Sequence, residues 1–135
     1  MSEPRDPFPR LPHAAPFLLL DRVFDIDEKA GTFLKLVTGA DPCVAPDGHL
    51  PAAFVLEALA QGGGALLTAQ TGGPTAGYLV AVDEFRMLGE VRVGDALHLE
   101  VTIARTFGST VVFRGRALVA DDVRAEARFT LSPPR

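Results

Sequence analysis

The sequence is poor in the residues that several kinds of site require. Its 135 residues include no tryptophan and one tyrosine, and the single cysteine, Cys43, excludes an internal disulfide. With only three scattered histidines beside it, this cysteine argues against a structural zinc site. Neither a P-loop nor a dinucleotide-binding glycine pattern is present, so we expect no metal and no cofactor. A net charge of −4 at pH 7 argues against binding to nucleic acid.

Long apolar runs are also lacking. No uninterrupted run reaches the roughly 18 residues that a membrane span needs, and residues 1–7 lack the apolar core of a signal peptide. Hydrophobic residues still make up 47% of the chain, which is too many for a disordered protein. We therefore predict a small, soluble, cytoplasmic protein without a membrane span. A proline-rich arm at residues 1–10 precedes a single domain at residues 11–135.

Turn-forming residues divide the domain into strands and one helix. Two strand-like segments flank a glycine-containing turn at residues 27–31, which predicts a hairpin. Residues 51–70 favour a helix, and Pro51 suits its first position. Alternating apolar residues predict antiparallel strands at residues 77–86, 95–106, 109–120 and 123–131. An α+β fold, in which an antiparallel sheet wraps around one long helix, buries both elements.

The predicted helix is apolar on almost every face, so we expect it to be buried on all sides. Gly62, Gly63 and Gly64 interrupt it, and each destabilises the helix by about 1 kcal/mol relative to alanine. Such a run indicates that another group approaches the helix closely. Either a ligand or another backbone segment explains it.

Three stretches resemble the 3-hydroxyacyl-[acyl carrier protein] dehydratases of fatty-acid synthesis. Residues 11–23 (LPHAAPFLLLDRV) resemble the opening segment of these enzymes, and residues 56–61 (LEALAQ) resemble their central-helix motif, including its acidic residue. Residues 93–101 (VGDALHLEV) look like their glycine–aspartate turn before a long strand. The resemblance implies the hot-dog fold and an acyl thioester, on acyl carrier protein or coenzyme A, as the partner. It also implies a homodimer or a higher homo-oligomer.

The loop before the helix departs from the dehydratase pattern. Those enzymes carry a catalytic histidine in a Gly-His-Phe-Pro-Gly loop and have a second Pro-Gly before the helix. Here residues 47–52 read DGHLPA, so the loop is several residues shorter. Counting back from Glu57 by the usual spacing reaches Cys43 instead of a histidine. The short loop is similar to that of a dehydratase-like branch encoded with aryl-polyene lipid pathways.

Glu57 is the strongest candidate for a catalytic residue. An ionised carboxylate is costly to bury in so apolar a helix unless it is paired, hydrogen-bonded or protonated. The resemblance implies a general acid that protonates a departing 3-hydroxyl group. The alternative is a structural carboxylate that pairs with Arg22, Arg86 or a backbone amide, or that lies at an exposed edge.

Gln61 and His49 are candidates for the same site. Gln61 lies one helical turn after Glu57, where it orients Glu57, binds a ligand amide or ties the helix to a strand. His49 is a candidate base for the proton at C2 of a thioester, and the alternative is a surface histidine. In the dehydratases the histidine and the acid come from opposite protomers, so their spacing within one chain does not decide the matter.

Six further positions complete the sequence-based assignment of the site. Free amides at the start of the helix can stabilise an enolate-like oxygen, so we assign its first residues to substrate binding. The positions assigned to substrate, besides Gln61, are Leu50, Pro51, Ala52, Gly62 and His13. For His13 the alternative is structural capping. The sixth position, Cys43, is expected to be an unactivated thiol.

Other polar residues are given surface roles. His98 lies on an alternating strand and is expected to face outward without chemistry. A group of arginines either attracts the phosphopantetheine or acidic surface of a carrier protein or only increases solubility. These are Arg86, Arg105, Arg114 and Arg116.

The resemblance and these residues predict a dehydratase that eliminates water from a 3-hydroxyacyl thioester to give a trans-2-enoyl thioester. One alternative is an acyl thioesterase of the hot-dog superfamily, in which Glu57 activates water. The other is a non-catalytic acyl-binding or partner subunit.

Overall fold

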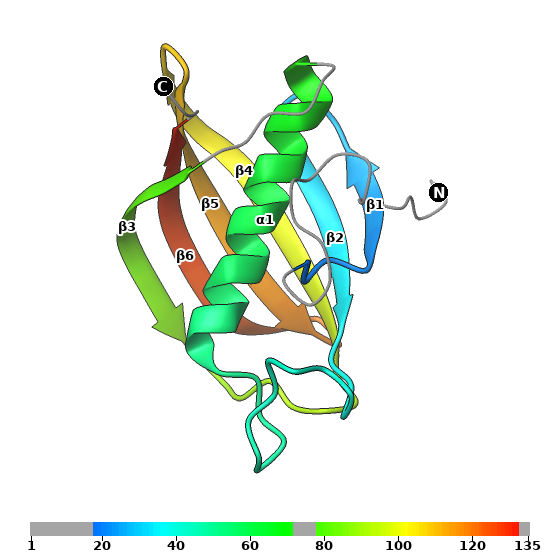
Figure 1. The fold of residues 1–135 in the computed structure, drawn as a ribbon. Coiled ribbons are helices and arrows are strands. Elements are labelled where there is room, and N and C mark those ends of the chain that lie inside the picture. Colours follow the sequence, from blue (N-terminus) through cyan, green and yellow to red (C-terminus); the bar gives the residue numbers. More distant parts are fainter. Residues whose placement is uncertain (1–17, 72–77, 133–135) are drawn as a thin grey trace.

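A computed structural model describes residues 18–71 and 78–132, which form one six-stranded sheet and one helix. In chain order the elements are β1 (Arg22–Ile26), β2 (Ala30–Leu36), α1 (Ala52–Thr71), β3 (Tyr78–Met87), β4 (Ala96–Phe107), β5 (Thr110–Val119) and β6 (Asp122–Ser132). The strands are antiparallel, in the spatial order β1-β2-β4-β5-β6-β3 (Figure 1). The predicted order of hairpin, helix and four strands is confirmed.

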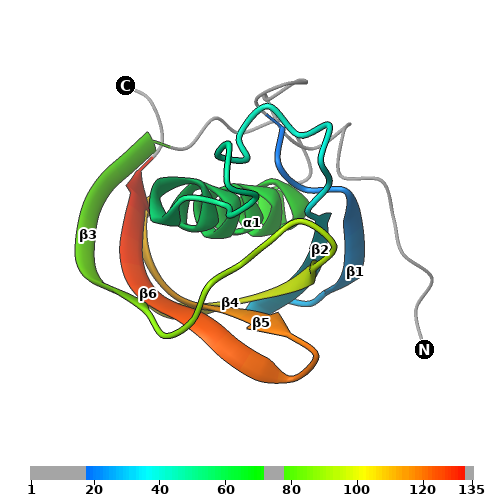
Figure 2. The same ribbon diagram turned by 90° about the horizontal axis from the view of Figure 1, so that it is seen from below.

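The sheet curls around α1, so that the helix lies against its concave face (Figure 2). Side chains that point to this face are buried; on β2 they alternate with partly exposed neighbours, as expected for a strand with one covered face. Phe33, Phe113 and Phe129 are fully buried, and the last two rings stack with centroids 5.4 Å apart. The core therefore lies between the sheet and the helix.

The helix is not buried on every side, so this part of the sequence-based prediction is wrong. Val55 and Leu59 are fully buried, but Phe54 is 36% exposed and Leu56 is partly exposed. The cause is geometric, because the curled sheet covers one side of α1. The stretch Ala52–Gln70 is also long and apolar enough to cross a membrane by length and composition alone, which the sequence analysis did not expect. Its packing into the sheet explains the same composition.

Two glycines of α1 allow the helix to approach the sheet closely. A Cβ added at Gly62 would lie 3.0 Å from carbon atoms of Phe33 and Val101. A Cβ added at Gly63 would lie 3.1 Å from carbon atoms of Phe129 and Leu131. These contacts support packing as the reason for the two glycines.

Strand β3 forms one edge of the described sheet and is exposed along most of its length. Among the described residues it pairs with β6 alone. Its exposed apolar side chains include Leu79 (40%), Val80 (57%) and Val82 (41%). Since consecutive strand residues point to opposite faces, both faces of this edge are open in a single chain.

The β5–β6 hairpin turns through two residues in a left-handed conformation. Ala120 has φ of 49° and Asp121 has φ of 67°. Val119 and Asp122 form the last pair of the ladder, which leaves a two-residue loop. Two positive φ angles match the type I′ turn that fits the twist of a hairpin, although alanine is strained there.

Candidate functional site

Glu57 and Gln61 lie one turn apart on α1, as the sequence predicts. The Gln61 Nε2 group donates a hydrogen bond to Glu57 Oε1 at 3.2 Å. Gln61 is 2% exposed, and its Oε1 atom accepts the amide of Leu19 at 2.8 Å. Gln61 therefore links the partly buried carboxylate to the segment before β1. The contact with Glu57 is compatible with an orienting role for Gln61, whereas the segment that Gln61 ties to the helix precedes β1 and is not itself a strand.

The arginines considered as partners of Glu57 are engaged elsewhere. The Arg22 guanidinium donates to the carbonyl oxygen of Asp21 at 2.9 Å. Arg86 forms an ion pair with Glu126 at 2.8 Å. Among the described residues, no ion pair joins Glu57 to either of these arginines.

His49 lies in the loop before α1. Hydrogen bonds fix this loop to the segment before β4. The amide of Leu50 donates to the carbonyl oxygen of Val91 at 2.8 Å, and the amide of Val93 donates to that of Gly48 at 2.9 Å. Gly48 has a φ of 89°, a conformation that favours glycine. The ring of His49 contacts the Asp47 carboxylate and is 38% exposed.

Among the described residues of one chain, no hydrogen bond or ion pair joins His49 to Glu57. The His49 ring bonds to Asp47, whereas Glu57 bonds to Gln61. Leu50 is 1% exposed and belongs to the core, whereas Ala52 is exposed at the start of the helix. Pro51 accepts the amide of Phe54 through its carbonyl oxygen at 3.0 Å.

The predicted role of His13 concerns a position outside the described residues. Gly62 packs between Phe33 and Val101, as described above. His98 is exposed and stacks on Phe24 with ring centroids 5.7 Å apart, so it faces outward.

Cys43 lies beside a buried ion pair that sequence reasoning missed. Lys35 Nζ and Asp41 Oδ2 are 2.6 Å apart, and their side chains are 5% and 10% exposed. Asp41 Oδ1 accepts the amide of Cys43 at 2.9 Å. Burial raises the pKa of the Cys43 thiol, and the charge of Asp41 raises it further. The thiol is therefore neutral at pH 7, as expected for an unactivated cysteine.

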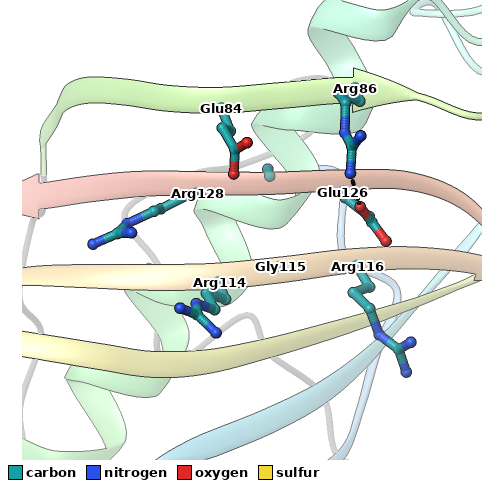
Figure 3. Close-up of a pocket in the computed structure, with 8 residues that line it drawn as sticks. Glu84, Arg86, Arg114, Gly115, Arg116, Glu126 and Arg128 are labelled. Atoms are coloured by element: carbon teal, nitrogen blue, oxygen red, sulfur yellow. Dashed lines mark hydrogen bonds and ion pairs between the residues drawn. The ribbon is translucent and has the colours of Figure 1, made fainter.

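A cavity of about 320 Å³ lies on the convex face of the sheet, away from α1 (Figure 3). Its position follows from β5, where a Cβ at Gly115 would point to Leu59 of the helix, so Arg114 and Arg116 point outward. Charged side chains of β3, β5 and β6 line it, including Arg128. Arg86 pairs with Glu126, and Arg116 pairs with Glu100 at 2.6 Å. This face is a charged surface separate from the helix that carries Glu57.

The other arginine considered for a carrier protein lies at the tip of the β4–β5 hairpin. The Arg105 guanidinium carbon is 4.5 Å from the centroid of the Phe107 ring. This is a cation–π contact between two exposed side chains.

A curled antiparallel sheet around a central helix that carries one carboxylate defines a protein of the hot-dog class. Fold comparison agrees: the dehydratase heterocomplex ApeI:P from Xenorhabdus doucetiae has a similar chain, with a TM-score of 0.90 and 22% identity over 96% of this chain and 91% of that chain. The Escherichia coli PaaI protein matches with a TM-score of 0.70 and 14% identity over 82% of this chain and 80% of that chain.

Sequence comparison identifies the family. The chain belongs to the ApeP-like family, described as ApeP dehydratase, over residues 6–135. It is also 36% identical over 130 residues to the 3-hydroxyacyl-[acyl-carrier-protein] dehydratase FabZ of Caulobacter vibrioides, covering 89% of this chain and 80% of the relative. The FabZ protein of Oceanobacillus iheyensis is 37% identical over 130 residues, covering 90% of this chain and 91% of the relative. The resemblance to the dehydratases and to their short-loop branch is thereby confirmed.

Proposed function

We propose that this protein eliminates water from a 3-hydroxyacyl thioester to give a trans-2-enoyl thioester. The observation that carries the proposal is Glu57, a carboxylate on the central helix held by the buried Gln61 in a chain of the ApeP-like dehydratase family. The relatives named above support acyl carrier protein as the carrier of the substrate. A cytoplasmic location is part of the same proposal.

The proposed reaction uses one base and one acid. His49 removes the proton at C2, and the electrons of that bond form the C2–C3 double bond as the C3–O bond breaks. Glu57 donates a proton to the departing hydroxyl group, which leaves as water. Backbone amides at the start of α1, near Ala52, stabilise the negative charge on the thioester oxygen.

The proposal assigns the two residues of one site to different protomers, because no hydrogen bond or ion pair joins His49 to Glu57 among the described residues of one chain. The open edge and exposed apolar residues of β3 support a homodimer in which this strand contacts a second copy. We propose that each site combines His49 of one protomer with Glu57 of the other.

The first experiment measures enoyl absorbance while the protein is incubated with 3-hydroxyacyl thioesters of several chain lengths, on acyl carrier protein and on coenzyme A. We expect turnover by the wild type and at least a hundredfold loss in Glu57→Gln, a typical size for general acid–base catalysis. Glu28→Gln, which removes an exposed carboxylate from the turn between β1 and β2, is the matched control and should retain activity. Absence of turnover with every substrate would exclude the proposal.

Mixing two inactive variants tests the shared site. A dimer of His49→Ala with Glu57→Gln contains one intact site, provided that the two residues come from different chains. Random exchange should then restore about one quarter of wild-type activity, because half of the dimers are mixed and each has one of two sites. No recovery would place both residues in the same chain.

A partner-subunit role is the second candidate. It is favoured by the absence of a hydrogen bond or ion pair between His49 and Glu57 among the described residues, and by a relative that was solved as a heterocomplex. The same assay separates the candidates, because a partner subunit binds the acyl thioester without converting it. Release of free thiol in place of enoyl product would indicate the thioesterase alternative.

A further inference from the structure

His49 is held by a neighbour that the proposed mechanism has not used. Asp47 lies two residues earlier, and its Oδ1 atom accepts the backbone amide of His49 at 3.1 Å. The same oxygen contacts the ring Nδ1 atom of His49. Asp47 Oδ1 therefore contacts both the backbone amide and the ring of His49, the candidate base.

The backbone of this segment is also fixed from outside the loop. His49 and Arg92 form an antiparallel bridge between the two segments. The Arg92 guanidinium donates a hydrogen bond to the carbonyl oxygen of Asp47 at 2.6 Å. Arg92 is in turn held by Glu90, whose carboxylate lies 3.0 Å from the guanidinium, and by Asp95, which accepts its amide at 2.8 Å. Asp47 is consequently placed by contacts that do not depend on its own side chain.

The contact fixes which ring nitrogen of His49 carries a proton. The hydrogen bond from the His49 ring, followed by that from its amide, holds the pKa of Asp47 below its usual value, so the carboxylate is ionised at pH 7. An ionised carboxylate only accepts hydrogen bonds, so Nδ1 must donate. The neutral ring then has its lone pair on Nε2, the atom that faces away from Asp47.

We infer that Asp47 is a positioning residue, which orients His49 and keeps its Nε2 atom available as the base toward the substrate. The inference rests on the proposed function, because it assigns His49 the role of base. In unrelated hydrolases, an aspartate likewise holds the catalytic histidine in one tautomer and orientation. Here the aspartate is a neighbour in sequence and belongs to the shortened DGHLPA loop.

The expected effect is moderate because the contact is open to water. The side chains of His49 and Asp47 are 38% and 64% exposed, so solvent screens their charges. We expect Asp47→Asn to lower kcat/KM at neutral pH by about tenfold, the effect of one charge-assisted hydrogen bond at a partly exposed site. Asp47→Glu should recover part of the activity.

The experiment combines activity with a measurement that needs no turnover. Chemical shifts of the ring nitrogens of His49, recorded by ¹⁵N NMR, report which nitrogen carries the proton. In wild type we expect the proton on Nδ1, and in Asp47→Asn a mixture of the two tautomers. Glu90→Gln is the matched control, because it removes a carboxylate that contacts Arg92 and leaves the Asp47–His49 contact in place.

The outcomes distinguish this inference from the proposed function. An unchanged ring spectrum in Asp47→Asn, or an activity of this variant equal to that of the wild type, would overturn the positioning role. A wild-type protein that never forms the enoyl product would overturn the dehydratase proposal, whatever the ring spectrum shows. An equal loss of activity in Glu90→Gln would assign the effect to the stability of the loop and overturn the inference.

Discussion

The substitution Asp41→Ala tests the buried ion pair that anchors the loop before α1. Lys35 points to the concave face of β2, and its ammonium group lies 2.6 Å from Asp41 Oδ2. The other Asp41 oxygen accepts the amide of Cys43. Removing the carboxylate leaves a charged ammonium group, 5% exposed, without its partner and also leaves an amide without its acceptor.

The expected loss is large because the surviving charge remains buried. Breaking one side of a buried pair destabilises a protein by about 3–5 kcal/mol. In a chain of this length each kcal/mol lowers Tm by about 4 °C, so Tm should fall by roughly 12–20 °C. The double variant Lys35→Met/Asp41→Ala should recover much of the loss, because no charge is then left in the core.

The pH dependence of stability gives an independent test of the contribution of Asp41. Burial alone raises the pKa of Asp41, but the hydrogen bonds from Lys35 and Cys43 outweigh it and hold that pKa below the ordinary 3.8. The stabilisation by Asp41 is therefore fully present above about pH 4 and is lost as the pH falls through the lower pKa of the folded state. The difference between wild type and Asp41→Ala should shrink in that acidic range.

Thermal and urea unfolding, monitored by circular dichroism from pH 3 to pH 7, measure these differences. Glu126→Ala is the control, because it breaks the exposed pair with Arg86 and should change stability by about 1 kcal/mol or less. A fall in Tm of less than about 2 °C in Asp41→Ala, or an equal fall in the control, would refute the reasoning.

Two further predictions concern backbone positions. Gly62→Ala should destabilise the fold by about 1–2 kcal/mol despite the better helix propensity of alanine, because the fully buried Phe33 and Val101 leave little room for its Cβ. Urea unfolding measures this difference in stability, and a stabilised variant would contradict the packing explanation. Ala120→Asn should stabilise the protein by about 0.5–1 kcal/mol, because asparagine tolerates the left-handed conformation better than alanine. Thermal unfolding measures the effect, and an unchanged or lower Tm would show that the turn is not strained.

The fold was predictable from sequence because its signals are local. Alternation of apolar residues, turn-forming pairs and one alanine-rich segment placed the helix at residues 51–70, and the structure has it at Ala52–Thr71. The resemblance of residues 56–61 then singled out Glu57 and Gln61, whose contact depends only on helical spacing.

Contacts between distant segments were not predictable in the same way. Lys35 resembles an ordinary surface lysine in a strand, and only the course of residues 37–41 shows that Asp41 returns to cover it. The one-sided burial of α1 depends on how far the sheet curls, which no local pattern encodes. The Asp47–His49 contact is local, and an aspartate two residues before a candidate base was the signal that could have revealed it.

The exposed edge of β3 also bears on how the protein folds. Within the described part of a single chain, the backbone groups on one side of β3 beside Leu79, Val80 and Val82 have no neighbouring strand, and such an edge is a surface on which strands of other chains can add. If a second copy covers this edge, assembly competes with aggregation for the same strand. The apparent Tm should then rise with protein concentration, since mass action favours the assembled form.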